Sequence, residues 1–349
     1  MRRSTLHRNR RAGSSGPGSA TRWPGTRSRR RSATAADGSA TTPTRDQAPA
    51  QDPARAAADP GPRLRVAGVQ MAMSADRAAN LARAVAGVES AASRGADLVV
   101  LPELFVDRYF PQRPSESAYL DLAEPVPGPT SEVIAALAGR LGVSIVAPVY
   151  ERVFSGLLFN TALVFGRDGA LRCRSRKTHI PDGPGYSEKY YFTPGDSDYP
   201  VTEVDGERPV PTGVGTCWDQ WFPEYARIVA LKGAQLIVYP TAIGSEPAYP
   251  DLDTHDAWRT VMRGHAIANA LFVMAVNRVG SEDALTFYGG SFVADPMGRV
   301  LAELGAEEGL LEATIDLSAI ARVRALSTFF RDRRPETYEA LVSGPRRRG

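Results

Sequence analysis

Short apolar runs and longer amphipathic stretches take turns along most of the chain. The mostly apolar run from Leu64 to Met71 is typical of a buried strand, and the alanine-rich stretch from Ala75 to Ser93 has helical spacing. A third run, 97–101, ends at a proline and predicts a short strand. The alternation continues with expected helices at 129–141, 224–232 and 254–269 and expected strands at 144–149, 160–165, 171–174, 213–217, 235–239 and 271–276.

Turn signals between some of these strands predict hairpins. Asp168-Gly169 lies between the strands expected at 160–165 and 171–174, and a second hairpin is expected on either side of 295–298. Because strands alternate with helices while hairpins add antiparallel pairs, the pattern predicts an α/β fold with mixed sheets. No break in composition interrupts residues 63–345, so we expect them to form one domain.

The two ends of the chain differ from this domain. Residues 1–62 are rich in Arg, Ser, Gly, Ala, Pro and Thr and nearly free of large aliphatic residues, so we expect a disordered basic extension. No apolar run of the kind found in a secretory signal precedes Leu64, whereas an organellar leader or a nucleic-acid-binding arm stays open. Residues 346–349 are expected to form a short basic tail.

The charge of the chain is unevenly distributed. The formal net charge is +3 and the pI is near 8.9, which would favour a nucleic-acid partner. Residues 1–62, however, contain twelve arginines and only four acidic residues, so they carry +8 and the rest of the chain carries −5. The excess positive charge belongs to the extension, and nucleic acid is not an expected partner of the domain.

Two further features of the sequence bear on membrane contact and on the cellular compartment. No apolar run approaches the roughly 18 residues that cross a bilayer, so no membrane contact is expected. The only two cysteines, Cys173 and Cys217, are too few for a disulfide scaffold and are typical of a reducing compartment. We therefore expect a cytoplasmic protein.

Metal and cofactor signatures are missing from the sequence. The four histidines (His7, His179, His255 and His265) share no ligand spacing, and the two cysteines are too far apart for a zinc pattern. No glycine-rich phosphate loop precedes a helix, and no Gly-x-Ser-x-Gly turn is present. We expect neither a metal nor a cofactor.

Cys217 is the most distinctive candidate for chemistry. It lies between the strand expected at 213–216 and a helix that would begin at Pro223, a place from which a sulfur can project. The backbone N–H of Trp218, directly after it, could bind a developing oxyanion. The alternative is a buried, inert cysteine.

A nucleophilic thiol needs a base and a group that stabilises the reacting oxygen. Glu103 follows the strand expected at 97–101 and is flanked by apolar residues, which would suit a general base. Lys177 follows the strand expected at 171–174 and could stabilise charge on a carbonyl oxygen. Taken separately, Glu103 could be a solvated loop carboxylate and Lys177 a surface cation.

Several blocks of residues together carry a resemblance to a known family. They are 176–186, followed by Glu188, Lys189 and Phe192, and then 217–224, 239–247 and 331–335. On these blocks the chain resembles the nitrilase superfamily of carbon–nitrogen hydrolases from about 64 to 341, and within it the N-carbamoylputrescine amidohydrolases. That superfamily uses a Glu-Lys-Cys triad, which Glu103, Lys177 and Cys217 match in order and spacing.

The resemblance implies a fold and a mechanism. The fold would be an α-β-β-α sandwich, in which two mixed sheets face each other with helices outside, and copies would associate into homo-oligomers. Glu103 would take the thiol proton of Cys217, while Lys177 and the Trp218 N–H would hold the oxyanion. No cofactor takes part in such a mechanism.

The resemblance also implies a substrate. Glu188 matches a carboxylate that supports the lysine and the substrate, although it could instead be a surface residue paired with Lys189. The small-molecule ureido substrate would be N-carbamoylputrescine, converted in polyamine biosynthesis to putrescine, carbon dioxide and ammonia. Its distal ammonium needs a carboxylate or an aromatic face, and Asp182, Glu246 and Tyr186 are candidates unless they only stabilise turns.

Two other functions stay open at this point. One is a different carbon–nitrogen hydrolysis on the same fold, acting on N-carbamoyl-β-alanine, N-carbamoyl amino acids, amides or nitriles. Most of these substrates carry a carboxylate and would favour an arginine in the pocket. The other is a non-catalytic scaffold with a nucleic-acid-binding basic arm, and the presence of Glu103, Lys177 and Cys217 argues against it.

Overall fold

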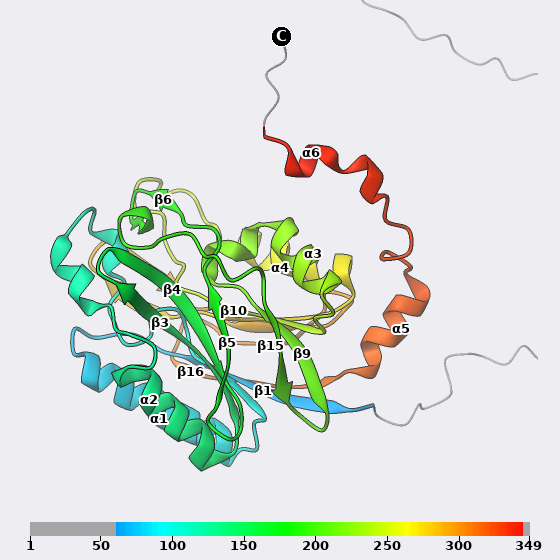
Figure 1. The fold of residues 1–349 in the computed structure, drawn as a ribbon, viewed down its shortest axis with the longest axis horizontal. Helices are drawn as coiled ribbons and strands as arrows, with labels where there is room; N and C mark the ends of the chain where they lie inside the picture. Colours follow the sequence, from blue (N-terminus) through cyan, green and yellow to red (C-terminus); the bar gives the residue numbers. More distant parts are fainter. Residues whose placement is uncertain (1–60, 345–349) are drawn as a thin grey trace, which may run out of the picture. The chain divides into compact units, whose positions relative to one another are not determined.

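The computed structural model describes residues 61–344, and two six-stranded sheets form the centre of this part (Figure 1). The predicted basic tail at 346–349, and all of the predicted extension except residues 61 and 62, lie outside the described residues. In order across the first sheet, the strands are β16 (Gly309–Asp316), β1 (Arg63–Gln70), β2 (Leu98–Val100), β3 (Ser144–Phe154), β4 (Leu157–Phe165) and β5 (Leu171–Arg176). Across the second sheet they are β15 (Val300–Glu303), β14 (Phe292–Ala294), β11 (Phe272–Val276), β10 (Leu236–Pro240), β9 (Pro209–Val214) and β8 (Val201–Asp205).

Both sheets are mixed, as the sequence predicts. The central strands β1, β2 and β3 of the first sheet run parallel, and so do β9, β10 and β11 of the second. Antiparallel neighbours flank them on both sides. The parallel strands place their carboxyl ends at one edge of each sheet, where the loops that carry chemistry begin.

Four helices cover the outer faces of the two sheets. Helices α1 (Arg77–Ser93) and α2 (Pro129–Leu141) pack on the first sheet, and α3 (Pro223–Leu231) and α4 (His255–Asn269) pack on the second (Figure 1). Between the sheets lies a core of aliphatic side chains drawn from both, including Leu64, Val100, Val164, Val214, Val238 and Met274. This arrangement is the α-β-β-α sandwich implied by the family resemblance.

Local sequence explains where these helices begin and end. Asp76 caps α1 by accepting hydrogen bonds from the backbone N–H groups of Ala78 and Ala79. Pro129 and Pro223 occupy the first position of α2 and α3, where no N–H is needed. Gly142 ends α2 with a φ of 66°, a left-handed conformation that suits glycine.

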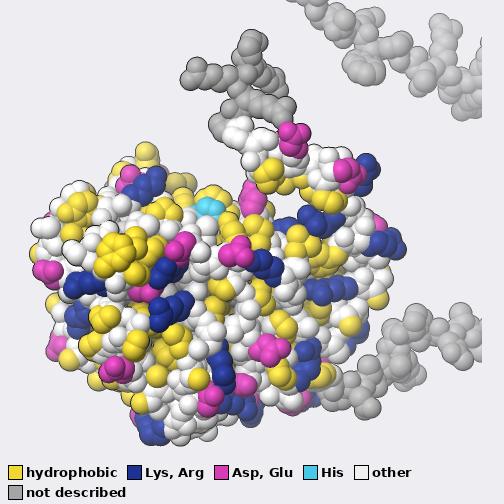
Figure 2. Space-filling view, viewed as in Figure 1, with side chains coloured by type: hydrophobic (Ala, Val, Ile, Leu, Met, Phe, Trp, Pro, Cys, Tyr) yellow, Lys and Arg dark blue, Asp and Glu magenta, His cyan; other side chains and the backbone are white. Residues whose placement is uncertain are grey.

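Smaller elements complete the described part. The hairpin of β12 (Val279–Glu282) and β13 (Leu285–Tyr288) and the short pair β6 (Asp182–Gly183) and β7 (Tyr186–Ser187) lie outside the large sheets. Short 3₁₀ helices cover Phe110–Gln112, Ser117–Leu122, Glu188–Tyr190, Cys217–Trp221 and Pro335–Thr337, and the last α-helices are α5 (Ser318–Leu326) and α6 (Glu339–Val342). Within residues 61–344, none of the helices is long and apolar enough to cross a membrane. On the face shown in Figure 2, basic and acidic side chains are interspersed rather than gathered by sign.

The structure corrects the predicted end of the strand that leads to Cys217. The strand predicted at 213–217 ends at Val214, and Cys217 instead begins a 3₁₀ helix with a φ of 42°. The chain leaves the sheet there because the carboxylate of Asp219 accepts the N–H of Thr216, at 3.0 Å, in place of a strand neighbour. The strands β8, β12, β13 and β16 were not predicted, and β3 extends five residues beyond its predicted end at Val149.

Candidate active site

The structure brings together the four residues that the sequence singles out for catalysis. Glu103 follows β2, Lys177 follows β5, Glu188 begins a 3₁₀ helix and Cys217 begins another. All four side chains are buried, and Lys177 contacts both carboxylates. Neither a solvated Glu103 nor a surface Lys177 is compatible with this arrangement.

Lys177 is the only cation in direct contact with the two buried carboxylates among the described residues. Its Nζ donates to Oε1 of Glu103 at 2.8 Å and to Oε2 of Glu188 at 2.5 Å. Burial alone would lower the pKa of Lys177, but the two carboxylates outweigh burial and raise the pKa. The lysine is therefore an ammonium at neutral pH.

Glu103 has one occupied and one free carboxylate oxygen. Oε1 accepts from Lys177 and also from Nδ2 of Asn160, on β4, at 2.7 Å. Oε2 is buried and has no hydrogen-bond partner among the described residues. A buried acceptor without a donor is costly, which makes this oxygen a natural acceptor for a proton from a neighbouring group.

Glu188 lies inside the site and not on the surface. It is fully buried and is bound to Lys177, while the neighbouring Lys189 is exposed, so the surface pairing of these two residues is wrong. The hydroxyl of Tyr109 donates to Oε1 of Glu188 at 2.5 Å. Burial raises the pKa of Glu188, Lys177 opposes this, and the charge of Glu103 adds to the rise.

The thiol of Cys217 is protonated at rest. Burial raises its pKa well above the usual value, Glu103 and Glu188 raise it further, and Lys177 opposes them. Its Sγ lies 3.7 Å from the carbonyl oxygen of Ala242. A thiol in this environment needs a base before it can act as a nucleophile.

Asp219 links the 3₁₀ helix that begins at Cys217 to the segment that follows Lys177. Its buried carboxylate accepts the backbone N–H of Thr216, and also the N–H of His179 at 2.9 Å and the N–H of Thr178 at 3.3 Å. It contacts Nδ1 of His179 at 2.8 Å as well. Asp219 thus joins the backbone beside Cys217 to the backbone beside Lys177.

A cavity of about 140 Å³ opens onto this cluster. Its lining comprises Glu188 and Cys217 of the cluster, the aromatic residues Tyr186, Trp218 and Tyr249, the acids Asp182 and Glu246, and Pro181, Gly183, Pro184 and Ile243. All three candidates for binding the distal ammonium are in this lining. None of the lining residues is basic.

The three ammonium candidates differ in their surroundings. Glu246 is half-buried, and burial raises its pKa. The hydroxyl of Tyr186 donates to the carbonyl oxygen of Ser245 and accepts from the N–H of Gly244, so this residue lines the cavity with its hydroxyl already engaged. Asp182 is exposed at the rim. Trp218 lies on the wall directly after Cys217, and the role of its N–H stays a prediction.

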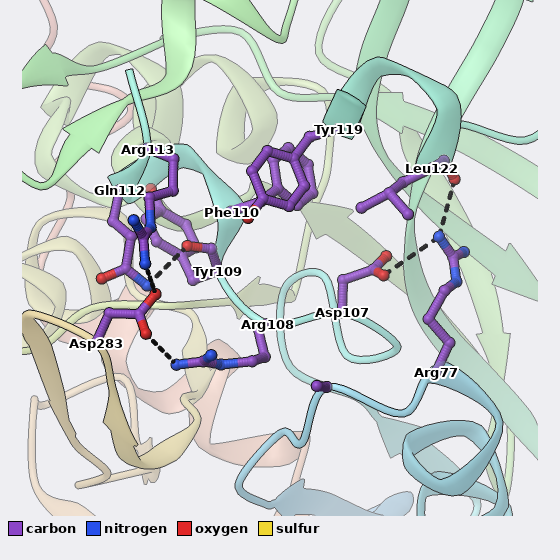
Figure 3. A pocket seen from close by; sticks show the side chains of 11 residues that line it. Arg77, Asp107, Arg108, Tyr109, Phe110, Gln112, Arg113, Tyr119, Leu122 and Asp283 are labelled. Carbon is purple, nitrogen blue, oxygen red and sulfur yellow. Dashed lines mark hydrogen bonds and ion pairs between the residues drawn. The ribbon is translucent and has the colours of Figure 1, made fainter. Parts of the chain in front are cut away.

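A second cavity, of about 250 Å³, adjoins the segment that follows Glu103 (Figure 3). Tyr109 lines it and reaches Glu188 with its hydroxyl, so Tyr109 lies between the two cavities. In its wall, Asp107 pairs with Arg77 at 3.2 Å. Burial raises the pKa of Asp107 to about 6, against the opposing charges of Arg77 and Arg278.

Sequence reasoning missed Asn160, Tyr109 and Asp219. The available signal was weak: Asn160 interrupts an apolar strand, and Asp219 follows the cysteine by two residues. Within residues 61–344, no group of three or more His, Cys, Asp or Glu side chains is arranged to hold a metal ion.

Known proteins resemble this chain over the whole described domain. The family model for carbon–nitrogen hydrolases matches residues 65–325. An N-carbamoylputrescine amidase from Solanum lycopersicum is 42% identical, with 80% of this chain and 94% of the relative covered. A citrullinase from Francisella tularensis is 41% identical over 80% of this chain and 98% of its own length. The crystal structure of a carbon–nitrogen hydrolase from Helicobacter pylori superposes with a TM-score of 0.76 at 37% identity, covering 80% of this chain and 99% of the other.

Proposed function

The chain belongs to the carbon–nitrogen hydrolase family of the nitrilase superfamily, and from this premise we propose that it hydrolyses N-carbamoylputrescine to putrescine, carbon dioxide and ammonia. One observation carries the proposal: the cavity over the buried Glu-Lys-Cys cluster has carboxylates in its lining and no basic side chain. N-carbamoylputrescine is neutral at its ureido end and cationic at the other. A carboxylate-lined cavity suits this substrate because an ammonium forms its strongest hydrogen bonds with carboxylates.

The reaction begins with a proton transfer inside the cluster. Oε2 of Glu103 takes the thiol proton of Cys217, and the thiolate sulfur bonds to the ureido carbonyl carbon. The carbonyl oxygen becomes negative and is held by the Lys177 ammonium and the N–H of Trp218. Glu103 then gives its proton to the leaving nitrogen, and the carbon–nitrogen bond breaks to leave a thioester-like intermediate on the sulfur.

Water completes the cycle. Glu103, again a carboxylate, takes a proton from a water molecule, whose oxygen bonds to the carbonyl carbon. The carbon–sulfur bond breaks and the thiol is restored. Hydrolysis of the intermediate releases a carbamate, which breaks down to carbon dioxide and an amine or ammonia. Overall, one substrate and one water molecule give putrescine, carbon dioxide and ammonia.

The relative named a citrullinase is as similar as the relatives named N-carbamoylputrescine amidases, so substrate charge must separate the two. N-carbamoyl-β-alanine carries only a carboxylate at the end away from the ureido group, and citrulline carries a carboxylate beside an α-ammonium there. In the cavity that carboxylate would face Asp182 and Glu246 with no arginine or lysine in the lining. Like-charge contact of this kind disfavours N-carbamoyl-β-alanine most, and it disfavours citrulline relative to N-carbamoylputrescine because citrulline brings a carboxylate along with its ammonium.

Turnover of three substrates by the purified protein tests this proposal. We expect kcat/KM for N-carbamoylputrescine to exceed the values for citrulline and N-carbamoyl-β-alanine by tenfold or more. A tenfold preference for either carboxylate-bearing substrate would show that the substrate assignment is wrong. Cys217→Ala should release no ammonia while keeping the circular dichroism spectrum of the wild type, and activity in this variant would disprove the nucleophile.

The variant Glu246→Gln tests whether Glu246 binds the distal ammonium of the substrate. Loss of a charged partner should raise KM for N-carbamoylputrescine by about ten- to a hundredfold. Butylurea is a matched neutral probe, since it keeps the ureido group and the carbon chain, and its KM should stay the same in the variant. Equal effects on both compounds would show that Glu246 does not bind the charge, and Asp182→Asn would then be the next variant to measure.

Three further expectations belong to this proposal. Family resemblance supports association into homo-oligomers, which light scattering on the purified protein measures. The free cysteines Cys173 and Cys217 support a reducing, cytoplasmic location, which a tagged full-length chain tests in cells. Removal of residues 1–62 should leave turnover unchanged, whereas salt-sensitive DNA binding that vanishes with those residues would favour the scaffold function.

A further inference from the structure

A buried arginine holds the segment that carries the general base. Arg278, between β11 and β12, is fully buried. Its Nη2 donates to the backbone carbonyl oxygens of Glu103 and Leu104, both at 2.8 Å, and of Asp107 at 3.1 Å. Its Nη1 donates to Oε1 of Glu282, at the end of β12, at 2.7 Å. Every hydrogen bond that Arg278 donates from its side chain thus goes to Glu282 or to the segment 103–107.

Glu282 holds the other end of the same segment. Its Oε2 accepts the backbone N–H of Tyr109 at 2.5 Å, and its side chain is almost completely buried. The cation therefore binds three carbonyl oxygens of the segment 103–109 and the anion binds one N–H. A buried ion pair is expensive to desolvate, and here its remaining hydrogen-bonding capacity is directed at one short stretch of backbone.

That stretch has a conformation that local sequence does not favour. Leu104 has a φ of 51°, in the left-handed region that a residue with a Cβ seldom adopts. The turn directs the carbonyl oxygens of Glu103 and Leu104 to a single guanidinium nitrogen. Such a conformation persists only where surrounding contacts impose it, and Arg278 supplies those contacts.

Both ends of the segment reach into the catalytic cluster. At one end, the carboxylate of Glu103 contacts Lys177, and at the other, the hydroxyl of Tyr109 contacts Glu188. The placement of the two carboxylates around Lys177 thus depends on how the segment is held.

Ion pairs on the surface also link the β12–β13 hairpin to the segment after Glu103, and they offer a control. Asp283, at the tip of the β12–β13 hairpin, pairs with Arg108 and with Arg113, each at 2.9 Å (Figure 3). These side chains are a third to a half exposed. Exposed pairs contribute little to stability, so the buried pair, and not the surface pairs, should fix the segment.

We propose that Arg278 is a positioning residue that, with Glu282, fixes the backbone of residues 103–109 and so aims the carboxylate of Glu103 at the thiol. It touches neither the substrate nor the reacting atoms. The inference rests on the proposed function only in that Glu103 is the base. It requires no particular leaving group.

Three variants test the proposal. Arg278→Lys keeps the charge, but one ammonium cannot bind three carbonyl oxygens and Glu282 together, so kcat should fall tenfold or more while KM stays within threefold. Arg278→Ala should lose more activity and should regain at least tenfold in kcat when millimolar guanidinium fills the space. Asp283→Asn, the matched control, should keep kcat within twofold of the wild type.

The outcomes separate positioning from mere structural support. Arg278→Lys with kcat within threefold of the wild type overturns the proposal, as does a loss of activity that only follows the unfolded fraction measured by thermal melting. If Arg278→Ala does not fold, Arg278→Lys alone decides. Should the wild type fail to hydrolyse N-carbamoylputrescine, the proposed function fails, and the same variants are compared on a simple amide that the wild type does turn over.

Discussion

Replacing Lys177 by methionine should damage both stability and catalysis, for reasons that can be separated. Methionine nearly matches the length of lysine but leaves two buried carboxylates, Glu103 and Glu188, without the cation that lies 2.8 Å and 2.5 Å from them. Removing one partner from a buried ion pair costs about 3–5 kcal/mol, a large part of the roughly 5–15 kcal/mol by which domains are stable. The melting temperature should fall by on the order of 10 °C. Loss of a group that stabilises the oxyanion should lower kcat by about 100- to 1000-fold.

The stability loss should depend on pH in a defined direction. Burial raises the pKa of Glu188 and Lys177 opposes this, so the pKa rises further when the lysine is removed. A carboxyl group whose pKa is higher in the folded than in the unfolded protein stabilises the fold at low pH and loses that contribution as the pH rises. The deficit of Lys177→Met should therefore be largest at alkaline pH and shrink on acidification.

Urea unfolding and steady-state kinetics test these expectations on four proteins, the wild type and three variants. Lys177→Met combined with Glu188→Gln removes one unpaired charge, so it should be about 1–2 kcal/mol more stable than Lys177→Met, yet no more active. Lys189→Met is the matched control, because this neighbouring lysine is exposed, and it should differ from the wild type by about 0.5 kcal/mol or less. The reasoning is refuted if Lys177→Met loses less than about 1 kcal/mol, or if the second substitution restores no stability.

Two other predictions concern the neighbourhood of the base. Burial raises the pKa of Asp107 to about 6, so its contribution to stability is complete below its unfolded pKa and is lost as the pH rises through about 6. Between about pH 4 and pH 7 the wild type should lose about 2 kcal/mol relative to Asp107→Asn in urea unfolding, and an unchanged difference would contradict this. Asn160→Ala removes the 2.7 Å hydrogen bond that Nδ2 of Asn160 donates to the Glu103 carboxylate, so kcat should fall by about tenfold or more, and an unchanged kcat would show that Asn160 does not hold the base in place.

The alternation of apolar runs and amphipathic helices was enough to predict the core of the fold. Strands such as β10 and β11 are buried on both faces, so they appear in the sequence as continuous apolar runs. The missed strands have other surroundings: β16 alternates irregularly at the edge of its sheet, and β12 (Val279–Glu282) contains glycine, serine and a glutamate. The pairing of two separate sheets came only from family resemblance, because periodicity does not indicate which strands share a sheet.

The candidate site likewise contains some residues that the sequence marks and others that only the structure reveals. Glu103, Lys177 and Cys217 each end or follow a recognisable strand, and multi-residue blocks marked them as a set. Arg278 carries no such mark, because an arginine after an apolar run usually lies at a solvated strand end. The carbonyl groups that it binds lie 171 to 175 residues away in the sequence, so only the folded chain shows that it is buried against the segment of Glu103.

The presence of a second carboxylate in the cluster has a reason in charge balance. At rest, one ammonium contacts two carboxylates while the thiol is neutral. In the proposed mechanism, when Glu103 takes the thiol proton the negative charge moves to the sulfur and then to the carbonyl oxygen, so the buried cluster would gain no net charge and no new desolvation cost would arise. Lys177 would nevertheless lose its partner Glu103 at the moment when its own charge is needed. Glu188, which contacts Lys177 and accepts from the hydroxyl of Tyr109, would remain beside the lysine and keep it charged throughout the proposed reaction, and this is a reason to bury a second carboxylate at such a cost.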